Sequence, residues 1–310
     1  MEFGKVPSEE VKSVDFTLPP DGELTAKIIN GKRVPQVDFF IGCAKWGRKE
    51  WVNIIYPPKT KEANFLDEYV KHFNSIELNA VFYSIPTKEQ VNKWKEKAMQ
   101  NATGQFLFFP KFPRIVSHIK RLKNAEQATD DFLASISEFG EFLGPCFLQL
   151  SDNFGPKNYA ILEEYIKSLP ADLNVFVELR HADWFKDREA RKMVCDMLAK
   201  YKKGAVITDV SGRRDVLHME LTIPEIFIRF VGNGKEHQDS DFARIDDWAI
   251  RIKSWLDHDL QKVYFFLHQH DELDTPVLAN YTIKVFNEKL GSDVPEIVFR
   301  KKEEGLFGNG

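Results

Sequence analysis

Eight short apolar runs recur along the chain, each bounded by turn residues. Most of them are apolar almost throughout rather than alternating, which is typical of strands covered on both faces of a parallel sheet. Many of the 26 phenylalanines lie in these runs, and aromatic residues favour strands. The predicted strands are 39–46, 75–83, 105–112, 146–150, 175–179, 205–210, 226–230 and 263–268. The pattern predicts one parallel sheet without hairpins.

Amphipathic segments separate most of these strands. In 64–73 the apolar residues recur at the i, i+3, i+4 spacing of a surface helix, and Thr87 followed by Gln90 resembles a capping box. Segment 211–225 has room for only a short helix. The predicted helices are 64–73, 88–98, 128–143, 159–169, 188–201, 246–256 and 276–290. Alternating strands and helices, with strand starts about 20 to 40 residues apart, predict an α/β fold of the (β/α)8 TIM-type barrel class.

One domain accounts for most of the chain. Residues 38–290 supply the length of about 250 residues that is usual for such a barrel. Residues 1–37 contain several prolines and glycines without sustained periodicity, so we expect an N-terminal extension, either packed or mobile. Residues 291–310 form a C-terminal tail, in which we expect 303–310 to fray.

Charge and composition narrow the function classes. The chain has 43 Lys and Arg against 47 Asp and Glu, so no global field draws it to nucleic acid or to an anionic membrane, although a local nucleic-acid contact stays open. Its apolar runs are far shorter than the roughly 18 residues of a membrane span, and residues 1–10 lack the apolar stretch of a signal peptide. Three widely separated cysteines without a CxxC pair indicate a reducing compartment. We expect a cytoplasmic protein with no membrane partner.

The carboxyl ends of the strands of such a barrel surround a common mouth, where active sites lie. Nearly every predicted strand turns polar at this end. The polar residues are Glu77, Glu178, Asp209, Lys111, Arg180, Arg229, Asn79 and Gln149. Buried charges cost several kcal/mol each unless they are paired, so we expect a connected and nearly neutral web. Such a web is either a ligand site or a rigid plug, and its place at the mouth favours a site.

Two members of this set are candidates for chemistry. Glu178 follows an apolar strand, so we expect burial to raise the pKa of its carboxyl and to make it a general acid or base. Arg180 acts on that pKa in the opposite direction. Lys111 is a phosphate contact, a general acid or the ion-pair partner of a carboxylate.

Other residues near the mouth are candidates for ligand contacts. His118 follows the 113–115 turn and is expected on a loop, where polar residues are often functional. Trp46 and Tyr83 come just beyond strand ends and could wall a pocket, although aromatic residues are more often part of a core.

Familiar cofactor and metal motifs are missing from the sequence. It contains no GxGxxG, GxxxxGK[ST], HExxH or GxSxG. His268 and His270 share one strand face and could bind a metal together with a carboxylate of the mouth. No third ligand follows at a recognisable spacing, so we expect neither a metal nor an organic cofactor.

Several segments resemble one known family. They are IGCAKW (41–46), HFNSIELNAVFYSIP (72–86), KFP (111–113), VELRHADW (177–184), TD (208–209) and IRF (228–230). In content and order they are similar to the DUF72 family, also called YecE-like proteins, through about residue 280. The resemblance implies a TIM-type barrel and brings no established activity. It departs at Val231, His268, Gln269 and Leu278, where the family usually has other residues, which suggests a shifted ligand or a partly lost site.

The sequence favours a metal-independent enzyme that uses general acid/base catalysis on a small polar substrate, phosphorylated or polyhydroxylated. Glu178 is the expected acid or base, with Glu77 or Asp209 as its partner. A cationic clamp and orienting hydrogen bonds are expected from Lys111, Arg180, Arg229, Gln149 and Asn79. Two alternatives stay open, a metal-dependent hydrolase or phosphodiesterase and a non-catalytic protein that binds a ligand or nucleic acid.

Overall fold

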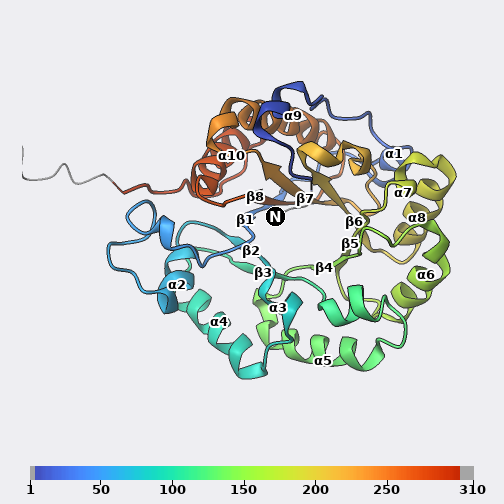
Figure 1. Ribbon diagram of the computed structural model, residues 1–310, viewed down its shortest axis with the longest axis horizontal. Coiled ribbons are helices and arrows are strands. Elements are labelled where there is room, and N and C mark those ends of the chain that lie inside the picture. The colour runs from blue at the N-terminus through green and yellow to red at the C-terminus, as the bar shows by residue number, and fades with distance from the viewer. Residues whose placement is uncertain (1–3, 301–310) are drawn as a thin grey trace, which may run out of the picture.

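The computed structural model describes residues 4–300 of the chain. Eight parallel strands form one sheet in the order β3-β2-β1-β8-β7-β6-β5-β4. They are β1 Asp38–Cys43, β2 Ser75–Leu78, β3 Leu107–Pro110, β4 Cys146–Gln149, β5 Val175–Glu178, β6 Gly204–Asp209, β7 Glu225–Gly232 and β8 Lys262–Gln269. The backbone also joins β3 to β4, because Gly144 N donates to Phe108 O at 2.8 Å and Phe112 N donates to Phe147 O at 2.9 Å. The predicted TIM-type barrel is confirmed (Figure 1).

Helices surround the barrel (Figure 1). The α-helices are α1 Thr25–Ile28, α2 Phe65–Tyr69, α3 Ala80–Tyr83, α4 Lys88–Asn101, α5 Glu126–Ile136, α6 Tyr159–Ser168, α7 Asp183–Lys186, α8 Arg188–Lys200, α9 Gln238–Leu256 and α10 Thr275–Leu290. Shorter helical turns are η1 Ser8–Ser13, η2 Lys49–Trp51, η3 Glu62–Asn64, η4 Ile115–Ile119, η5 Ser137–Phe142, η6 Pro156–Asn158, η7 Ser211–Val216 and η8 Lys235–His237. Every predicted helix is present, and Thr87 Oγ1 accepts a hydrogen bond from Gln90 N at 3.2 Å as the cap of α4.

Two local elements differ from the prediction. The run 75–83 is a strand only as far as Leu78, and Ala80–Tyr83 form α3 instead. A short apolar run fits a buried strand and a buried helical turn equally well, so its periodicity does not separate them. Segment 128–143 divides into α5 and η5, and Gly140 inside η5 has a φ of 56°, in the left-handed region that glycine adopts readily.

Aromatic rings fill the interior of the barrel. The inner core consists of Phe40, Leu107, Phe109, Phe147, Phe176, Val206, Phe227, Tyr264 and Phe266. The Phe227 ring lies among the others, with centroid separations between 4.9 and 6.3 Å. A larger core lies between the sheet and the helices. The interior below the mouth is therefore packed with side chains and is not a pore.

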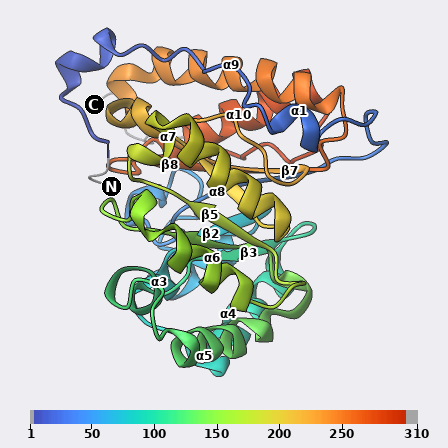
Figure 2. The same ribbon diagram turned by 90° about the vertical axis from the view of Figure 1, so that its right-hand side faces the viewer.

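The described part of the N-terminal extension packs against the barrel. Thr25 Oγ1 donates to Met219 O at 2.6 Å and accepts from Leu221 N at 2.8 Å. The ring of Phe16 lies 4.7 Å from the guanidinium carbon of Arg244 on α9. Figure 2 shows the extension running along α9 toward α1. Of the two expectations for this segment, these contacts support the packed one.

The C-terminal tail also packs against the barrel over its described part. Val294 and Ile297 are buried, and Arg300 N donates to Ile54 O at 2.8 Å. Segment 303–310, for which fraying is predicted, lies outside the described residues.

Two expectations from composition can be compared with the structure. Between residues 4 and 300 no helix is both long enough and apolar enough to cross a bilayer. The three cysteines, Cys43, Cys146 and Cys195, are buried free thiols. They are part of the packed interior and the structure shows no disulfide among them.

Candidate functional site

The aromatic inner core determines which side chains reach the mouth. Successive side chains of a strand point to opposite faces, so the residue two positions beyond an inward-facing one also points inward. Two positions beyond the inner core, strands β3 to β8 lead to Lys111, Gln149, Glu178, Thr208, Arg229 and His268. Every one of them is polar, and a polar layer therefore covers the aromatic interior at the carboxyl ends of the strands.

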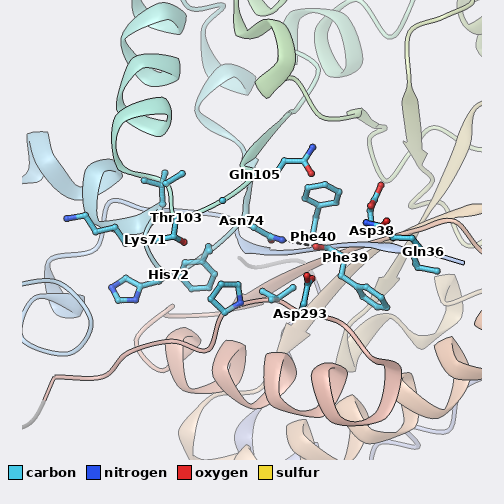
Figure 3. A pocket seen from close by; sticks show the side chains of 17 residues that line it. Gln36, Asp38, Phe39, Phe40, Lys71, His72, Asn74, Thr103, Gln105 and Asp293 are labelled. Atoms are coloured by element: carbon cyan, nitrogen blue, oxygen red, sulfur yellow. Dashed lines mark hydrogen bonds between the residues drawn. The ribbon is translucent and has the colours of Figure 1, made fainter.

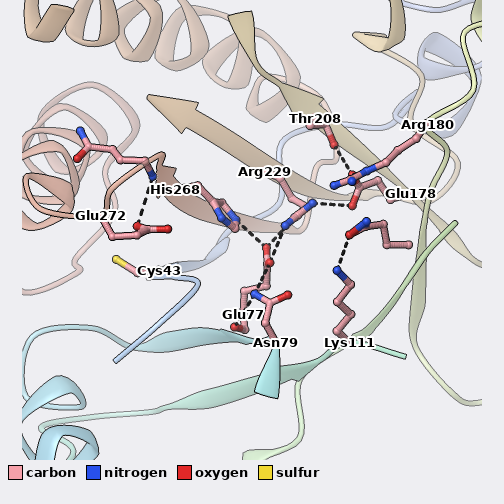
Figure 4. A network of polar contacts seen from close by, with 12 residues as sticks. Cys43, Glu77, Asn79, Lys111, Glu178, Arg180, Thr208, Arg229, His268 and Glu272 are labelled. Atoms are coloured by element: carbon pink, nitrogen blue, oxygen red, sulfur yellow. Dashed lines mark hydrogen bonds and ion pairs between the residues drawn. The ribbon is translucent and has the colours of Figure 1, made fainter. Parts of the chain in front are cut away.

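Arg229 on β7 joins carboxylates from two distant strands (Figure 4). Its Nε and Nη2 donate to the two oxygens of Glu77, each at 2.8 Å, and its Nη1 donates to Glu178 Oε2 at 2.7 Å. Arg180 Nε donates to the other oxygen of Glu178 at 2.7 Å. All four side chains are buried. We call Glu77, Glu178, Arg180 and Arg229 the mouth web.

Three further side chains complete the hydrogen bonding of the mouth web. Asn79 Nδ2 donates to Glu77 Oε1 at 2.8 Å, and His268 Nε2 lies 3.0 Å from Glu77 Oε2. Thr208 Oγ1 donates to Glu178 Oε1 at 3.2 Å. The sequence prediction left Thr208 out, and it considered His268 as a metal ligand and as a departure from the family pattern. Strand alternation is the signal that identifies both, because each lies two positions beyond an inner-core residue.

Both carboxylates of the web are held ionised. Burial by itself raises the pKa of Glu178, but Arg180 and Arg229 outweigh it and lower this pKa to about 2. Burial by itself also raises the pKa of Glu77, but Arg229 and His268 outweigh this effect and hold the pKa well below its ordinary value. The predicted rise of the Glu178 pKa is therefore wrong, because two arginines face one carboxylate. A group with this pKa and with both oxygens in use is poorly suited to proton transfer near neutral pH.

Lys111 is a titratable side chain of the mouth whose pKa is lowered to near neutrality. Its ammonium donates to Gln149 Oε1 and lies 4.2 Å from the centroid of the Phe82 ring. Burial, followed by the charge of Arg229, lowers the pKa of Lys111 to about 7. Among the described residues no carboxylate forms an ion pair with Lys111. Its hydrogen-bond partner is the neutral amide of Gln149. The charge of this ammonium is therefore not compensated by direct contact.

A cavity of about 640 Å³ opens above this layer. From the predicted site it is lined by Glu77, Asn79, Lys111, Gln149, Arg180, His118, Trp46 and Tyr83. Arg229 belongs to the mouth web but is not one of the residues that line the cavity. Sequence reasoning did not assign the further lining residues Lys45, Phe82, Arg114 and Glu272 to the site. The structure thus brings most of the predicted side chains to one cavity, whose floor is polar and whose rim includes aromatic rings.

Asp209 lies outside this cavity. It follows the inward-facing Thr208 directly, so it points to the other face of β6. Its Oδ1 accepts from Arg244 Nη2 at 2.8 Å, and its Oδ2 accepts from Trp248 Nε1 at 2.7 Å. Arg214 also pairs with this carboxylate. The predicted role of Asp209 as the partner of Glu178 is therefore wrong, and the reason is the parity of its position in the strand.

His118 lies on the helical turn η4 rather than on the predicted loop. η4 is a π-helical turn, an uncommon element that is frequent at functional sites. The ring of His118 packs edge to face on Phe82 with centroids 5.1 Å apart, and its Nδ1 is 2.9 Å from Ser117 Oγ. Burial and then the charge of Lys111 lower the pKa of His118 to about 4. His118 is therefore neutral at pH 7 and offers the cavity a hydrogen-bonding ring without charge.

The mouth residues do not fit a metal site. The oxygens of Glu77 and Glu178 already accept hydrogen bonds from arginine, and His268 Nε2 is bonded to Glu77. Within residues 4–300 no three His, Cys, Asp or Glu side chains are grouped so as to hold an ion. The arginine contacts therefore weigh against the metal-dependent alternative.

A second hollow, of about 360 Å³, lies at the opposite end of the barrel (Figure 3). Its lining includes Asp38, Phe40 and Asn74. The Asn74 side chain donates to Phe39 O at 2.7 Å and accepts from Ile41 N at 2.8 Å, so it is used to hold β1. Because this polar group serves the backbone, we place the candidate site at the mouth.

Residues 40–298 match the family described as "Protein of unknown function DUF72". The chain belongs to the DUF72 family. The resemblance carried by the sequence motifs is thereby confirmed. Of the positions that depart from the family pattern, His268 lies in the mouth, whereas Leu278 packs beside Gly232 and does not line the cavity.

Relatives in the family bring no named activity. The chain is 28% identical over 276 residues to UPF0759 protein YecE of Escherichia coli strain K12, which covers 83% of this chain and 94% of that protein. It is 28% identical over 153 residues to UPF0759 protein YunF of Bacillus subtilis strain 168, and this match covers 47% of this chain and 52% of that protein.

Solved structures of DUF72 family proteins share the fold. The protein of Enterococcus faecalis V583 has a TM-score of 0.63 at 19% identity, covering 86% of this chain and 99% of that one. The protein of Thermotoga maritima MSB8 has a TM-score of 0.62 at 21% identity, covering 81% and 99%. The function of this chain must therefore be argued from its own cavity.

Proposed function

We propose that this protein is a metal-independent barrel enzyme that acts by general acid/base catalysis on a small polar, anionic substrate held in the mouth cavity. Lys111 takes the role of the proton-transferring group, in place of Glu178. A general acid or base works best when its pKa lies near the working pH, and the pKa of Lys111, lowered to about 7 by burial, meets this condition. Glu178, with a pKa of about 2, does not.

The mouth web has a positioning role in this proposal. Its two carboxylates and two arginines hold one another through bonds of 2.7 and 2.8 Å. Groups fixed in this way do not need to reorganise when charge develops on a substrate. Arg180 lines the cavity and is the web member that contacts the substrate, whereas Arg229 acts from beneath by fixing Glu77 and Glu178. Gln149, Asn79 and His118 supply neutral hydrogen bonds, and Trp46 and Tyr83 wall the rim.

The charge of Lys111 supports an anionic substrate. A buried cation is costly unless an opposite charge lies against it, and the direct partner of Lys111 is the neutral Gln149. An anionic group in the cavity supplies the missing counter-charge. The observation that carries the proposal is this buried ammonium, 7% exposed, at the wall of a cavity large enough for a metabolite.

A thermal-shift screen of phosphorylated and polyhydroxylated metabolites, followed by turnover assays on each stabilising compound, tests the proposal. We expect turnover to survive dialysis against a chelator and kcat/KM to depend on a group with a pKa near 7. Lys111→Met is expected to abolish turnover while the protein stays folded. Lys111→Arg should not restore it, because a guanidinium does not release its proton in this pH range.

The matched control is Lys192→Met on the outer helix α8, where the lysine is exposed and pairs with Asp196. This variant should keep full activity. Undiminished turnover in Lys111→Met would overturn the role of Lys111. A ligand that stabilises the protein but is recovered unchanged after long incubation would favour the non-catalytic alternative and overturn the enzymatic one.

A further inference from the structure

The rim of the mouth cavity carries aromatic rings that are exposed or only partly buried. Tyr83 on α3 is 79% exposed, the largest exposed fraction among the large apolar side chains of the described residues. Its ring touches Phe82 edge to face, with centroids 5.2 Å apart. Trp46 is half-buried, and Trp94 supports it from behind at 5.8 Å. All three rim residues, Trp46, Phe82 and Tyr83, line the cavity.

The floor and the side of the same cavity are cationic. Four basic side chains and two carboxylates line it. The basic residues are Lys45, Lys111, Arg114 and Arg180, and the carboxylates are Glu77 and Glu272. The lining therefore has a surplus of two positive charges when Lys111 is protonated. Glu77 is in addition neutralised by Arg229, which lies below the wall.

The aromatic rim and the cationic floor meet at one residue. The centroid of the Phe82 ring lies 4.2 Å from the Lys111 ammonium and 5.2 Å from the centroid of the Tyr83 ring. A single small molecule can therefore contact both the ammonium and the exposed ring. Aromatic faces bind flat apolar faces of ligands, and lysine and arginine bind phosphate.

We propose that the ligand of this cavity is a phosphate monoester with a flat apolar face, whose phosphate lies against Lys111 and Arg180 and whose flat face stacks on Tyr83 and Trp46. Its negative charge complements the cationic lining of the cavity. The flat face belongs to an aromatic ring or to a sugar ring, which share this contact. The inference uses the cavity of the proposed function, but it concerns binding and does not require turnover.

Binding of three probes, measured by isothermal titration calorimetry at pH 7, tests the inference. Methyl phosphate has the anionic group alone, phenyl phosphate adds an aromatic ring, and glucose 6-phosphate adds a sugar ring. We expect one of the two ring-bearing probes to bind about tenfold more tightly than methyl phosphate, as stacking on one aromatic side chain is worth. Which of them does so identifies the kind of flat face.

Variants separate the two halves of the cavity. Tyr83→Ala should remove most of this tenfold preference and leave methyl phosphate binding unchanged, whereas Tyr83→Phe should keep the preference because the ring remains. Lys111→Met should weaken all three probes by a similar factor. Phe299→Ala, at an exposed aromatic residue of the C-terminal segment, is the matched control and should change nothing.

Equal affinities for all three probes, or a preference that survives Tyr83→Ala, would overturn the stacking contact. Absence of binding by every probe would overturn the phosphate assignment. The proposed function fails or stands separately: turnover of a substrate without phosphate, lost in Lys111→Met, would support the enzyme and overturn this inference. Ring-dependent binding without any turnover would do the opposite.

Discussion

Two buried networks of arginines and carboxylates lie at the carboxyl ends of the strands. One is the mouth web, formed by Glu77, Glu178, Arg180 and Arg229. The other, which we call the outer cluster, consists of Asp209, Arg214, Asp241 and Arg244. Both contain the same kinds of residue, and bonds between 2.7 and 3.1 Å occur in each. They differ in what covers them.

Protein covers the outer cluster. The guanidinium of Arg244 contacts two rings, 4.7 Å from Phe16 of the N-terminal extension and 4.1 Å from Phe230 of β7. Asp241 accepts from Asn233 N at 2.7 Å, and Trp248 holds the remaining oxygen of Asp209. The cluster therefore joins β6, α9 and the extension, and its role is structural.

A cavity covers the mouth web instead. Glu77 and Arg180 line it together with Lys111, whose hydrogen-bond partner is an amide. Residue type therefore does not separate a structural network from a site. Adjacent residues of one strand, Thr208 and Asp209, reach opposite networks, so the side of the strand decides.

The largest expected effect is common to both networks. Arg229→Met leaves Glu77 and Glu178 buried without their shared partner, and Arg244→Met does the same to Asp209 and Asp241. Each substitution should lower the free energy of unfolding by about 3–5 kcal/mol, as for other broken buried ion pairs. Urea unfolding measures this, and an unchanged midpoint in either variant would show that its network is not structural.

The same two variants should differ in ligand binding, measured on folded protein at low temperature. Arg244→Met should bind phenyl phosphate as the unsubstituted protein does, because the outer cluster does not touch the cavity. Arg229→Met should bind it at least tenfold more weakly, because Arg229 fixes Glu178 and thereby Arg180. Equal weakening by both would mean that the two networks are one functional unit.

Acid should weaken both networks. The pKa of Glu178 is lowered to about 2 from an ordinary 4.5, and the pKa of Asp209 is also lowered, since Arg244 and Arg214 outweigh its burial. Each carboxylate is deprotonated in the folded protein where the unfolded chain has begun to bind protons. Stability is therefore lost as pH falls from 4.5 toward 2 for Glu178, and as pH falls below 3.8 for Asp209. The loss is up to about 1.4 kcal/mol per pH unit for each group.

Urea unfolding between pH 6 and 3 measures this loss. Glu178→Gln and Asp209→Asn should each be less stable than the unsubstituted protein at pH 6 and show a flatter dependence on pH. A slope that neither substitution changes would mean that other carboxylates govern unfolding in acid.

Substitution of Lys111 should raise stability at pH 7, whereas Arg229→Met and Arg244→Met should lower it. Burial lowers the pKa of Lys111 from 10.5 to about 7, so between these values the unfolded chain holds more protons on this side chain than the folded protein does. Stability contributed by this group therefore rises with pH over that window, by up to about 1.4 kcal/mol per pH unit. Lys111→Met should be more stable than the unsubstituted protein at pH 7 and should lack this rise.

Unfolding at pH 7, 8 and 9 checks the sign. A lysine that the fold needs would give a less stable variant, and that result would contradict the assignment of Lys111 to ligand binding. Lys192→Met serves again as the control, since an exposed lysine should change neither stability nor slope by more than about 0.5 kcal/mol.

The smallest expected effects on stability come from removing one aromatic ring beside each network. Phe16→Ala removes a half-buried ring from Arg244 and should cost about 1–2 kcal/mol through lost burial and a lost cation–π contact. Tyr83→Ala, at a ring that is 79% exposed, should change stability by less than about 0.5 kcal/mol. Melting temperatures measure both, and a large loss in Tyr83→Ala would mean that this ring serves the fold.

Local pattern was sufficient for much of the fold. Continuous apolar runs identify the eight strands, because a parallel strand buried on both faces is apolar at nearly every position. Helical periodicity identifies the helices between them. A short apolar run does not distinguish a strand from a helical turn, and Ala80–Tyr83, predicted as part of a strand, form a helix. The π-helical turn that carries His118 has no comparable sequence pattern, because its irregular hydrogen bonding depends on the residues that pack around it.

The barrel, the family and the polar character of the strand ends can be predicted from the sequence, since each follows from residues close together in the chain. Three features depend instead on contacts between distant segments: Glu178 meets two arginines, Asp209 belongs to a different network, and Lys111 has a neutral partner. Arg229 and Glu77 are 152 positions apart in the chain. The sign of a pKa shift depends on such distant partners, because charge acts through space rather than along the chain.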